Sequence, residues 1–245
     1  MLYKYPLRRF SMQQYLINDI YRATEGEGVF VGRSQVFVRF QGCAVGCINC
    51  DSMDTWSFDI GPTSIESIFE KILEESYQGK INWISITGGD PLHPKHVPSV
   101  VALSKFLKEK GFKLNLEAAG TRVVDEVFEN LDYISFDLKT PSTGVQTRLS
   151  LIEKLAQNYN GKFQLKAVIA DRKDFDYTLG AYRKLEESLG SIDFPWVLTP
   201  CFEPSEEFPM QRFIDIQDWN QLEGGPFRVI GQQHKWIYGA DKKSV

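Results

Sequence analysis

Short apolar stretches with strand character alternate with amphipathic stretches with helical character along most of this 245-residue chain. Strand and helix units of this length return the chain to a parallel neighbouring strand and leave the helices outside the sheet. The sequence therefore predicts an α/β fold with one domain over residues 1–245, an incomplete or modified (β/α) barrel of mostly parallel strands. The predicted strands are 15–21, 34–41, 82–86, 113–117, 132–138, 162–169, 194–199 and 227–230.

The clearest helix begins at Thr63-Ser-Ile-Glu66, which has the pattern of a capping box, and Gly79 is its predicted end. Apolar residues follow at helical spacing between these two points. Each further predicted helix also lies between two predicted strands, as the alternating fold requires. These helices are 95–110, 147–158, 175–189 and 210–220.

Polar residues and glycines gather directly after the strands, at 87–90, 117–121, 135–139 and 199–201. In parallel α/β sheets and barrels, ligands bind at the carboxyl ends of the strands. These four segments are therefore predicted to line one site at a common rim.

Composition restricts the class of partner. A net charge of −4 gives no general attraction to nucleic acid or to an anionic membrane, so a small molecule is the expected partner. No apolar run approaches the ~20 residues that span a bilayer. Residues 1–10 carry Lys4, Arg8 and Arg9 without a following apolar stretch, so no secretory signal is expected and the predicted location is the cytoplasm.

Three of the four cysteines, Cys43, Cys47 and Cys50, fall within eight residues after the predicted strand 34–41. Thiolates this close can reach one metal centre, but they are one ligand short of a closed zinc site. A four-iron cluster with one iron open to a non-protein ligand fits their number better. The alternatives are a zinc site completed by Cys201, or disulfides, which a reducing cytosol disfavours.

The spacing Cys43-x3-Cys47-x2-Cys50 resembles that of the radical S-adenosylmethionine superfamily. The resemblance implies that the three cysteines hold a [4Fe-4S] cluster and that S-adenosylmethionine chelates the open iron. Reduction then yields methionine and a 5′-deoxyadenosyl radical. In such enzymes the cofactors carry the chemistry, and the protein binds, orients and excludes side reactions.

Gly88-Gly89-Asp90-Pro91 is similar to the Gly-Gly-Glu-Pro motif that receives the amino group of S-adenosylmethionine in this superfamily, with Asp90 in place of Glu. Taken alone, it would be an ordinary turn. Glu117 is expected to bind the ribose hydroxyls, although a strand-end carboxylate in solvent is the alternative. Ser135 and Lys139 are expected to contact the carboxylate or the ribose; Asp137 is left without a role.

A narrower resemblance covers the chain from about Tyr15 onward. Glu25-Gly-Glu27-Gly28, Gly32-Arg33, Phe37-Val-Arg39, Cys50-Asp51-Ser52 and Gln233-His234-Lys-Trp236 together resemble the 7-carboxy-7-deazaguanine synthase family. Glu25 stands where that family often has Gln. The family contracts the ring of 6-carboxy-5,6,7,8-tetrahydropterin with loss of ammonia, so it implies a pterin substrate and a place in queuosine or deazapurine biosynthesis.

The family resemblance also implies the substrate site and Mg²⁺. Glu27 would accept hydrogen bonds from the aminopyrimidinone edge, and Arg39 would bind the substrate carboxylate. Ser52 would be a hydroxyl ligand of Mg²⁺, with substrate oxygens and water completing the shell. Glu25, Asp51 and His234 would complete the substrate site. Without the resemblance, Arg39 could be a strand-edge salt bridge, Ser52 a turn hydroxyl and His234 a packing residue.

Two other functions share parts of this pattern. A glycyl-radical activating enzyme has the same cysteine spacing but acts on a protein, whereas Glu27, Arg39 and His234 suit a small anionic heterocycle. A non-catalytic iron–sulfur or zinc protein would not cleave S-adenosylmethionine. The resemblance further implies an external electron donor, such as a flavodoxin or ferredoxin, and a homodimer.

Overall fold

In the part of the chain that the structure describes, eight strands form one sheet in which the spatial order follows the chain order from the first strand to the last. The first pair is antiparallel and every later pair is parallel. The computed structural model describes residues 13–204 and 206–245. The strands are β1 (Ile17–Thr24), β2 (Ser34–Phe40), β3 (Trp83–Gly88), β4 (Lys113–Ala118), β5 (Tyr133–Asp137), β6 (Phe163–Ile169), β7 (Trp196–Pro200) and β8 (Arg228–Val229).

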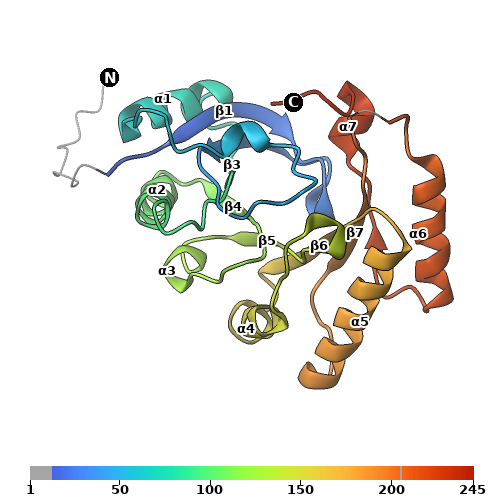
Figure 1. The fold of residues 1–245 in the computed structure, drawn as a ribbon. Helices are drawn as coiled ribbons and strands as arrows, with labels where there is room; N and C mark the ends of the chain where they lie inside the picture. Colours follow the sequence, from blue (N-terminus) through green and yellow to red (C-terminus); the bar gives the residue numbers. More distant parts are fainter. Residues whose placement is uncertain (1–12, 205) are drawn as a thin grey trace.

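The sheet is open, because β1 and β8 are the two edges and do not pair with each other. The predicted incomplete barrel of mostly parallel strands is thereby confirmed. Helices α1 to α5 lie around the outside of the curved sheet, and α6 and α7 lie on the side of β7 (Figure 1). The helices are α1 (Ile65–Glu75), α2 (Val97–Glu109), α3 (Asp125–Phe128), α4 (Leu149–Tyr159), α5 (Arg172–Leu189), α6 (Met210–Leu222) and α7 (Gln233–Tyr238).

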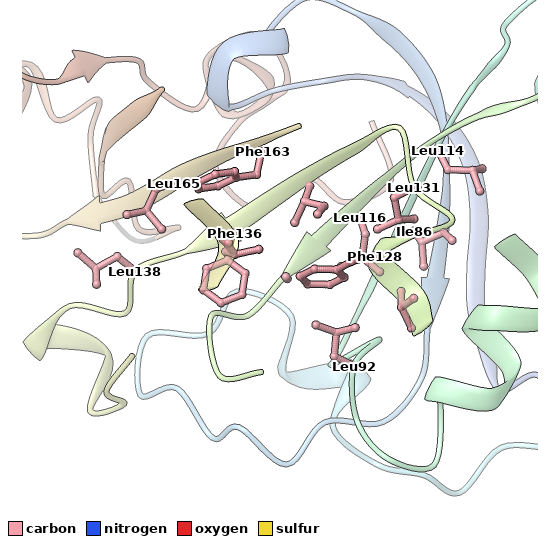
Figure 2. Close-up of a cluster of buried hydrophobic side chains, with 14 of the residues drawn as sticks. Ile86, Leu92, Leu114, Leu116, Phe128, Leu131, Phe136, Leu138, Phe163 and Leu165 are labelled. Atoms are coloured by element: carbon pink, nitrogen blue, oxygen red, sulfur yellow. The ribbon is translucent and has the colours of Figure 1, made fainter. Parts of the chain in front are cut away.

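Alternate residues of the strands point to two very different environments. One face packs against the helices and is largely apolar; Figure 2 shows part of it, where Leu116 and Phe136 of the sheet meet Phe128 of α3. The other face, inside the curve, carries many buried polar side chains. These are Gln35, Ser85, Asn115, Ser135, Gln164, Lys166 and Thr199. A buried polar face of this kind needs partners for its donors and acceptors, either within the protein or from a ligand.

Aromatic rings pack together at the amino-terminal end of the sheet interior. The 3₁₀ turn η1 (Gly28–Phe30) brings Phe30 to within 4.5 Å of Tyr133, measured between ring centroids. The Arg33 guanidinium lies between Phe30 and Trp83, 4.0 and 3.7 Å from their ring centroids. These residues fill the end of the barrel opposite the predicted site.

Several local predictions need correction. The N-cap of α1 is Ser64 rather than Thr63, since the Ser64 hydroxyl accepts a hydrogen bond from the Ser67 amide. Helix α5 begins three residues earlier than predicted, because Asp171 caps it. The short helices α3 and α7 were not predicted, since four to six residues show too little periodicity.

The prediction about residues 1–10 falls outside the described residues. Among the described helices, none combines the length and apolarity needed to cross a bilayer.

Candidate functional site

The cysteine loop lies between β2 and the 3₁₀ turn η2 (Met53–Thr55). Cys43, Cys47 and Cys50 are half-buried and form no disulfide. The backbone N–H groups of Val45 and Ser52 each lie 3.4 Å from a cysteine sulfur, as donors to Cys43 and Cys50 respectively. Free sulfurs that already receive backbone hydrogen bonds suit thiolate ligands, because such bonds tune cluster thiolates.

The three sulfurs do not form a site for a single ion. Among residues 13–204 and 206–245, no three His, Cys, Asp or Glu side chains are grouped closely enough to hold one metal ion. A zinc site needs four ligands around one ion, whereas each cysteine of an iron–sulfur cluster binds a different iron. Three cysteine ligands therefore match, in number and type, a four-iron cluster with one iron left open. Cys201 is buried at the end of β7. Burial raises the pKa of its thiol, the Arg212 cation opposes that rise and the Glu203 carboxylate adds to it.

The cysteine loop is fixed to the rim of the sheet by backbone hydrogen bonds from three segments. The Gly42 carbonyl accepts from the Asp90 amide at 3.0 Å, and the Cys43 amide donates to the Trp56 carbonyl at 3.1 Å. On the far side, the Ile48 amide donates to the Thr143 carbonyl at 2.9 Å. The loop is thus held against the ends of β3 and β5, as the strand-end prediction requires.

Gly88 and Gly89 have no room for a side chain. A Cβ at Gly88, whose φ is +145°, would lie 2.4 Å from the Phe40 carbonyl oxygen. A Cβ at Gly89 would lie 2.6 Å from the Gly42 carbonyl oxygen and 2.8 Å from Cβ of Cys43. The glycine pair therefore lets β3 approach the cysteine loop, which places any ligand of Gly88 and Gly89 beside Cys43.

Asp90 is turned into its own loop. Its Oδ1 accepts a hydrogen bond from the Leu92 amide at 3.0 Å, and the side chain is buried. Burial raises the pKa of this carboxyl, although the Leu92 bond opposes the rise. The shorter aspartate thus caps the Asp90-Pro91-Leu92 turn, a structural role that does not require contact with a cofactor.

Lys139 lies at the same rim, after β5. Its Nζ donates to Asp137 Oδ2 at 2.8 Å. Burial raises the pKa of the Cys47 thiol, and the nearby Lys139 ammonium opposes that rise. A cation therefore stands beside one of the cysteine sulfurs, and Asp137, left without a role by the sequence, is its partner.

Ser135 and Glu117 are register neighbours on β5 and β4, and Ser135 lies four residues before Lys139 in the chain. The Ser135 hydroxyl is buried and accepts a hydrogen bond from Gln164 Nε2 at 2.8 Å. Glu117 accepts from Asn115 Nδ2 at 2.7 Å and from Lys166 Nζ at 2.8 Å. Both predicted residues face the polar interior, although Ser135 lies deeper than Lys139.

Glu25 and Glu27 enter this interior from the loop after β1. Glu27 Oε1 accepts from Gln232 Nε2 at 2.7 Å, and Glu27 Oε2 lies 3.3 Å from Lys166 Nζ. Burial works against ionisation of Glu27, but Lys166 and His234 outweigh it and lower the pKa to about 2. Glu25 differs: burial and then the charge of Glu117 raise its pKa to about 7.

The two glycines of this loop are explained by the side chains that lie against them. A Cβ at Gly26 would lie 1.9 Å from Nδ1 of His234, and a Cβ at Gly28 would lie 2.4 Å from Nε2 of Gln164. Helix α7 is attached here too, since the Gln233 amide donates to the Gly26 carbonyl at 2.9 Å. The sequence Glu25-Gly26-Glu27-Gly28 therefore packs its carboxylates and His234 into one interior.

Arg39 connects the substrate residues to the cysteine loop. One terminal nitrogen donates to the Tyr21 hydroxyl at 2.7 Å and the other to Ser52 Oγ at 3.4 Å. The Ser52 hydroxyl in turn donates to Asp51 Oδ1 at 3.1 Å. On its other side, Asp51 lies 3.6 Å from Nζ of Lys235 in α7. The predicted carboxylate-binding arginine thus touches the predicted Mg²⁺ ligand.

Other residues of this interior were missed by the sequence analysis. Lys166 and Gln164 lie within an apolar strand, where their alternation with Phe163 and Leu165 was the available signal. Gln232 had no local signal, because its partner Glu27 is 205 residues away. His96, to which no role was assigned, lies under the cysteine loop with Nε2 3.3 Å from the Gly42 carbonyl oxygen.

Comparison with known proteins gives a consistent result. A family model described as a 4Fe-4S single cluster domain matches residues 24–163. The chain is 32% identical to 7-carboxy-7-deazaguanine synthase of Aquifex aeolicus, over 89% of this chain and 91% of that protein. It is 29% identical to the Thermoplasma acidophilum enzyme of the same name, over 91% and 97%. The crystal structure of QueE from Escherichia coli matches with a TM-score of 0.66 at 21% identity, covering 91% of this chain and 96% of that chain.

Proposed function

The chain belongs to the 7-carboxy-7-deazaguanine synthase family, and we propose that it converts 6-carboxy-5,6,7,8-tetrahydropterin to 7-carboxy-7-deazaguanine by radical ring contraction with loss of ammonia. One observation carries the proposal. Arg39, at the end of β2, contacts Ser52 of the cysteine loop, so a carboxylate-binding group and the cluster residues share one rim. The product belongs to queuosine and deazapurine biosynthesis.

Cys43, Cys47 and Cys50 are the residues that would hold the [4Fe-4S] cluster. Gly88 and Gly89 offer backbone, with no side chain, next to Cys43, which suits the amino end of S-adenosylmethionine. Glu117 and Lys139 would bind its ribose and carboxylate, and Ser135 is assigned to the same ligand. When bound, cluster and S-adenosylmethionine supply a 5′-deoxyadenosyl radical that removes a hydrogen atom from the substrate.

The remaining residues bind and orient the pterin. Glu27, held ionised, accepts hydrogen bonds from the N–H groups of the aminopyrimidinone edge. Arg39 binds the carboxylate with the donors that remain to it. Glu25 and His234 would complete the substrate site, and Gly26 lets the His234 ring lie against the loop. Together they orient the ring that is to contract.

Mg²⁺ would be bound jointly by protein and substrate. Ser52 offers a hydroxyl and the adjacent Asp51 a carboxylate, with Ser52 Oγ 3.1 Å from Asp51 Oδ1. Substrate oxygens and water would complete the shell, because a hard cation of this kind keeps several waters when it binds. Removal of Mg²⁺ should therefore weaken substrate binding more than binding of S-adenosylmethionine.

The cellular setting is proposed on the family resemblance. The protein would act in the cytoplasm as a homodimer and would receive electrons from a flavodoxin or ferredoxin. Substitution of the cysteines by alanine should abolish cleavage of S-adenosylmethionine with any donor.

The proposal is tested with anaerobically reconstituted protein, S-adenosylmethionine, Mg²⁺, a reductant and the carboxytetrahydropterin. A deazaguanine carboxylate detected by mass spectrometry is the expected product. Cleavage of S-adenosylmethionine without this product, with the cluster shown intact by its absorbance, would reject the substrate assignment while keeping the reaction class. The Cys47→Ala variant serves as the control for uncatalysed breakdown.

A further inference from the structure

Lys166 is a buried cation on the inner face of β6 that no predicted role explains. Its side chain is about 10% exposed, and its Nζ lies 2.8 Å from Glu117 Oε2 and 3.3 Å from Glu27 Oε2. These two glutamates come from different parts of the site, namely the strand assigned to the cofactor and the loop assigned to the substrate. One ammonium therefore joins the two ligand regions.

The charges around Lys166 are predominantly negative. An ammonium buried without partners would lose its proton, since burial disfavours the charged form. Here burial does oppose the charge, but the surrounding carboxylates outweigh it and raise the pKa of Lys166. The titratable groups around it are Glu117 on β4, Asp137 on β5, Glu25 and Glu27 on the loop after β1, Lys139 after β5 and His234 on α7.

Each of the two paired glutamates is held at both oxygens. The Lys166 ammonium takes one oxygen of each, while Asn115 Nδ2 and Gln232 Nε2 donate to the other oxygens of Glu117 and Glu27, both at 2.7 Å. A carboxylate oxygen has two lone pairs, so each of these oxygens can still accept one more hydrogen bond. Both glutamates are thus fixed in orientation and ready for a ligand donor.

We propose that Lys166 is a positioning residue for both ligands: its ammonium, 2.8 Å from Glu117 Oε2 and 3.3 Å from Glu27 Oε2, orients the two carboxylates as acceptors for S-adenosylmethionine and the pterin. The inference rests on the proposed function for the identity of the two ligands. Without the ammonium, two carboxylates would remain buried near each other and near Glu25. Buried carboxylates without a cation take up a proton, and a protonated carboxyl is a weaker acceptor.

The test measures binding rather than turnover. Dissociation constants for S-adenosylmethionine and for the carboxytetrahydropterin are determined separately by anaerobic calorimetry on reconstituted, unreduced protein with Mg²⁺ between pH 6 and pH 9. For Lys166→Met we expect at least a tenfold loss of affinity for each ligand at pH 7. The loss of pterin affinity should shrink toward pH 9, because the Lys166 ammonium helps to hold the pKa of Glu27 low and its removal lets that carboxyl take up a proton at lower pH. Lys166→Arg should retain most of the affinity for both ligands at pH 7.

Two controls separate this role from a merely structural one. Lys108→Met removes a partly exposed lysine paired with Asp132 outside the barrel and should change neither constant. Glu117→Gln should weaken binding of S-adenosylmethionine alone, and Glu27→Gln binding of the pterin alone. The thermal unfolding midpoint of each variant establishes that it is folded.

The outcomes distinguish the inference from the function on which it rests. Unchanged affinities in Lys166→Met, or a loss of pterin affinity that is the same at every pH, would overturn the positioning role. If the unsubstituted protein binds S-adenosylmethionine but not the pterin, the proposed function fails, and with it the substrate half of the inference. A loss of S-adenosylmethionine affinity in Lys166→Met that is absent in Lys166→Arg would still uphold the cofactor half.

Discussion

Glu25 is a buried carboxyl whose proton is the main pH-sensitive element of the inner site. Its Oε2 accepts from Gln35 Nε2 at 2.6 Å and its Oε1 from the Glu27 amide at 3.2 Å. Burial, then repulsion from Glu117, raises its pKa to about 7. Near neutral pH, Glu25 is therefore partly protonated, a neutral form that resembles the glutamine often found here in the family.

We predict that Glu25→Gln changes the pH dependence of stability. A folded-state pKa raised from the usual value means that the stabilisation from Glu25 is complete below about pH 4.5 and lost as the pH rises to about 7. Glutamine has no carboxyl proton, so the variant should not show this loss of stability. The free energy of unfolding of the variant, relative to that of the wild type, should therefore rise by up to about 3 kcal/mol over that pH interval. Denaturant unfolding at pH 5 and pH 8 measures the gain.

The matched control is Glu70→Gln, which changes an exposed glutamate of α1 in the same way. It should follow the wild type at both pH values. Parallel curves for the wild type and Glu25→Gln would show that Glu25 ionises normally in the folded protein.

Arg39 tests the substrate site at the residue scale. We predict that Arg39→Ala weakens pterin binding by about 2 to 3 kcal/mol, on the order of 100-fold in Kd, because a charge pair loses one partner. Affinity for S-adenosylmethionine should hardly change. Calorimetric titration with each ligand gives both numbers.

Arg22→Ala is the control for Arg39. Arg22 lies on the adjacent strand β1, but it donates to the Glu75 carbonyl at 3.0 Å and stacks on Tyr77, away from the inner face. If both alanine variants weaken pterin binding equally, the loss reflects the β1 and β2 pair rather than a contact with the substrate.

At the scale of elements, α7 and the loop after β1 form one unit through Gly26. The backbone of Gly26 does not lie in the left-handed region, so alanine is excluded only by the His234 ring. We predict that Gly26→Ala displaces His234 and lowers kcat/KM for the pterin at least tenfold, with little change in global unfolding. Steady-state kinetics and thermal unfolding report on the two effects.

Gly180→Ala is the corresponding control, because Gly180 lies inside α5 and a Cβ there would meet no atom within 4 Å. Alanine at a helix interior should raise stability by about 0.5 to 1 kcal/mol and leave kinetics unchanged. Wild-type kinetics in Gly26→Ala would mean that His234 does not act on the substrate from its position in this structure.

At the scale of the whole molecule, the sequence predicted the order of the strands and of the longer helices, because periodicity and strand-end glycines are local signals. The inner face was not predictable in the same way. Lys166 and Glu27 are 139 residues apart, and Gln232 and Glu27 are 205 residues apart. Such pairs form only once the sheet has curved. The local sequence around Lys166 indicates an apolar strand and does not indicate a partner for a buried lysine. Asp90 differs from these pairs, since its partner is the Leu92 amide only two residues away.

The open sheet predicts how hydrogen exchange should vary through the molecule. Strands β3 to β6 are paired on both sides and carry the apolar core (Figure 2), so their amides should exchange only through global unfolding. The two-residue strand β8 is an edge, and the neighbouring Ile230 amide, which donates to Leu198, should exchange sooner by local opening. Binding of S-adenosylmethionine should then slow exchange at the rim segments 42–56 and 88–92 and leave α5 unchanged. Exchange measured by mass spectrometry on reconstituted protein, with and without the ligand, checks both gradients; slowing confined to the α5 and α6 side would place the ligand away from the cysteine loop.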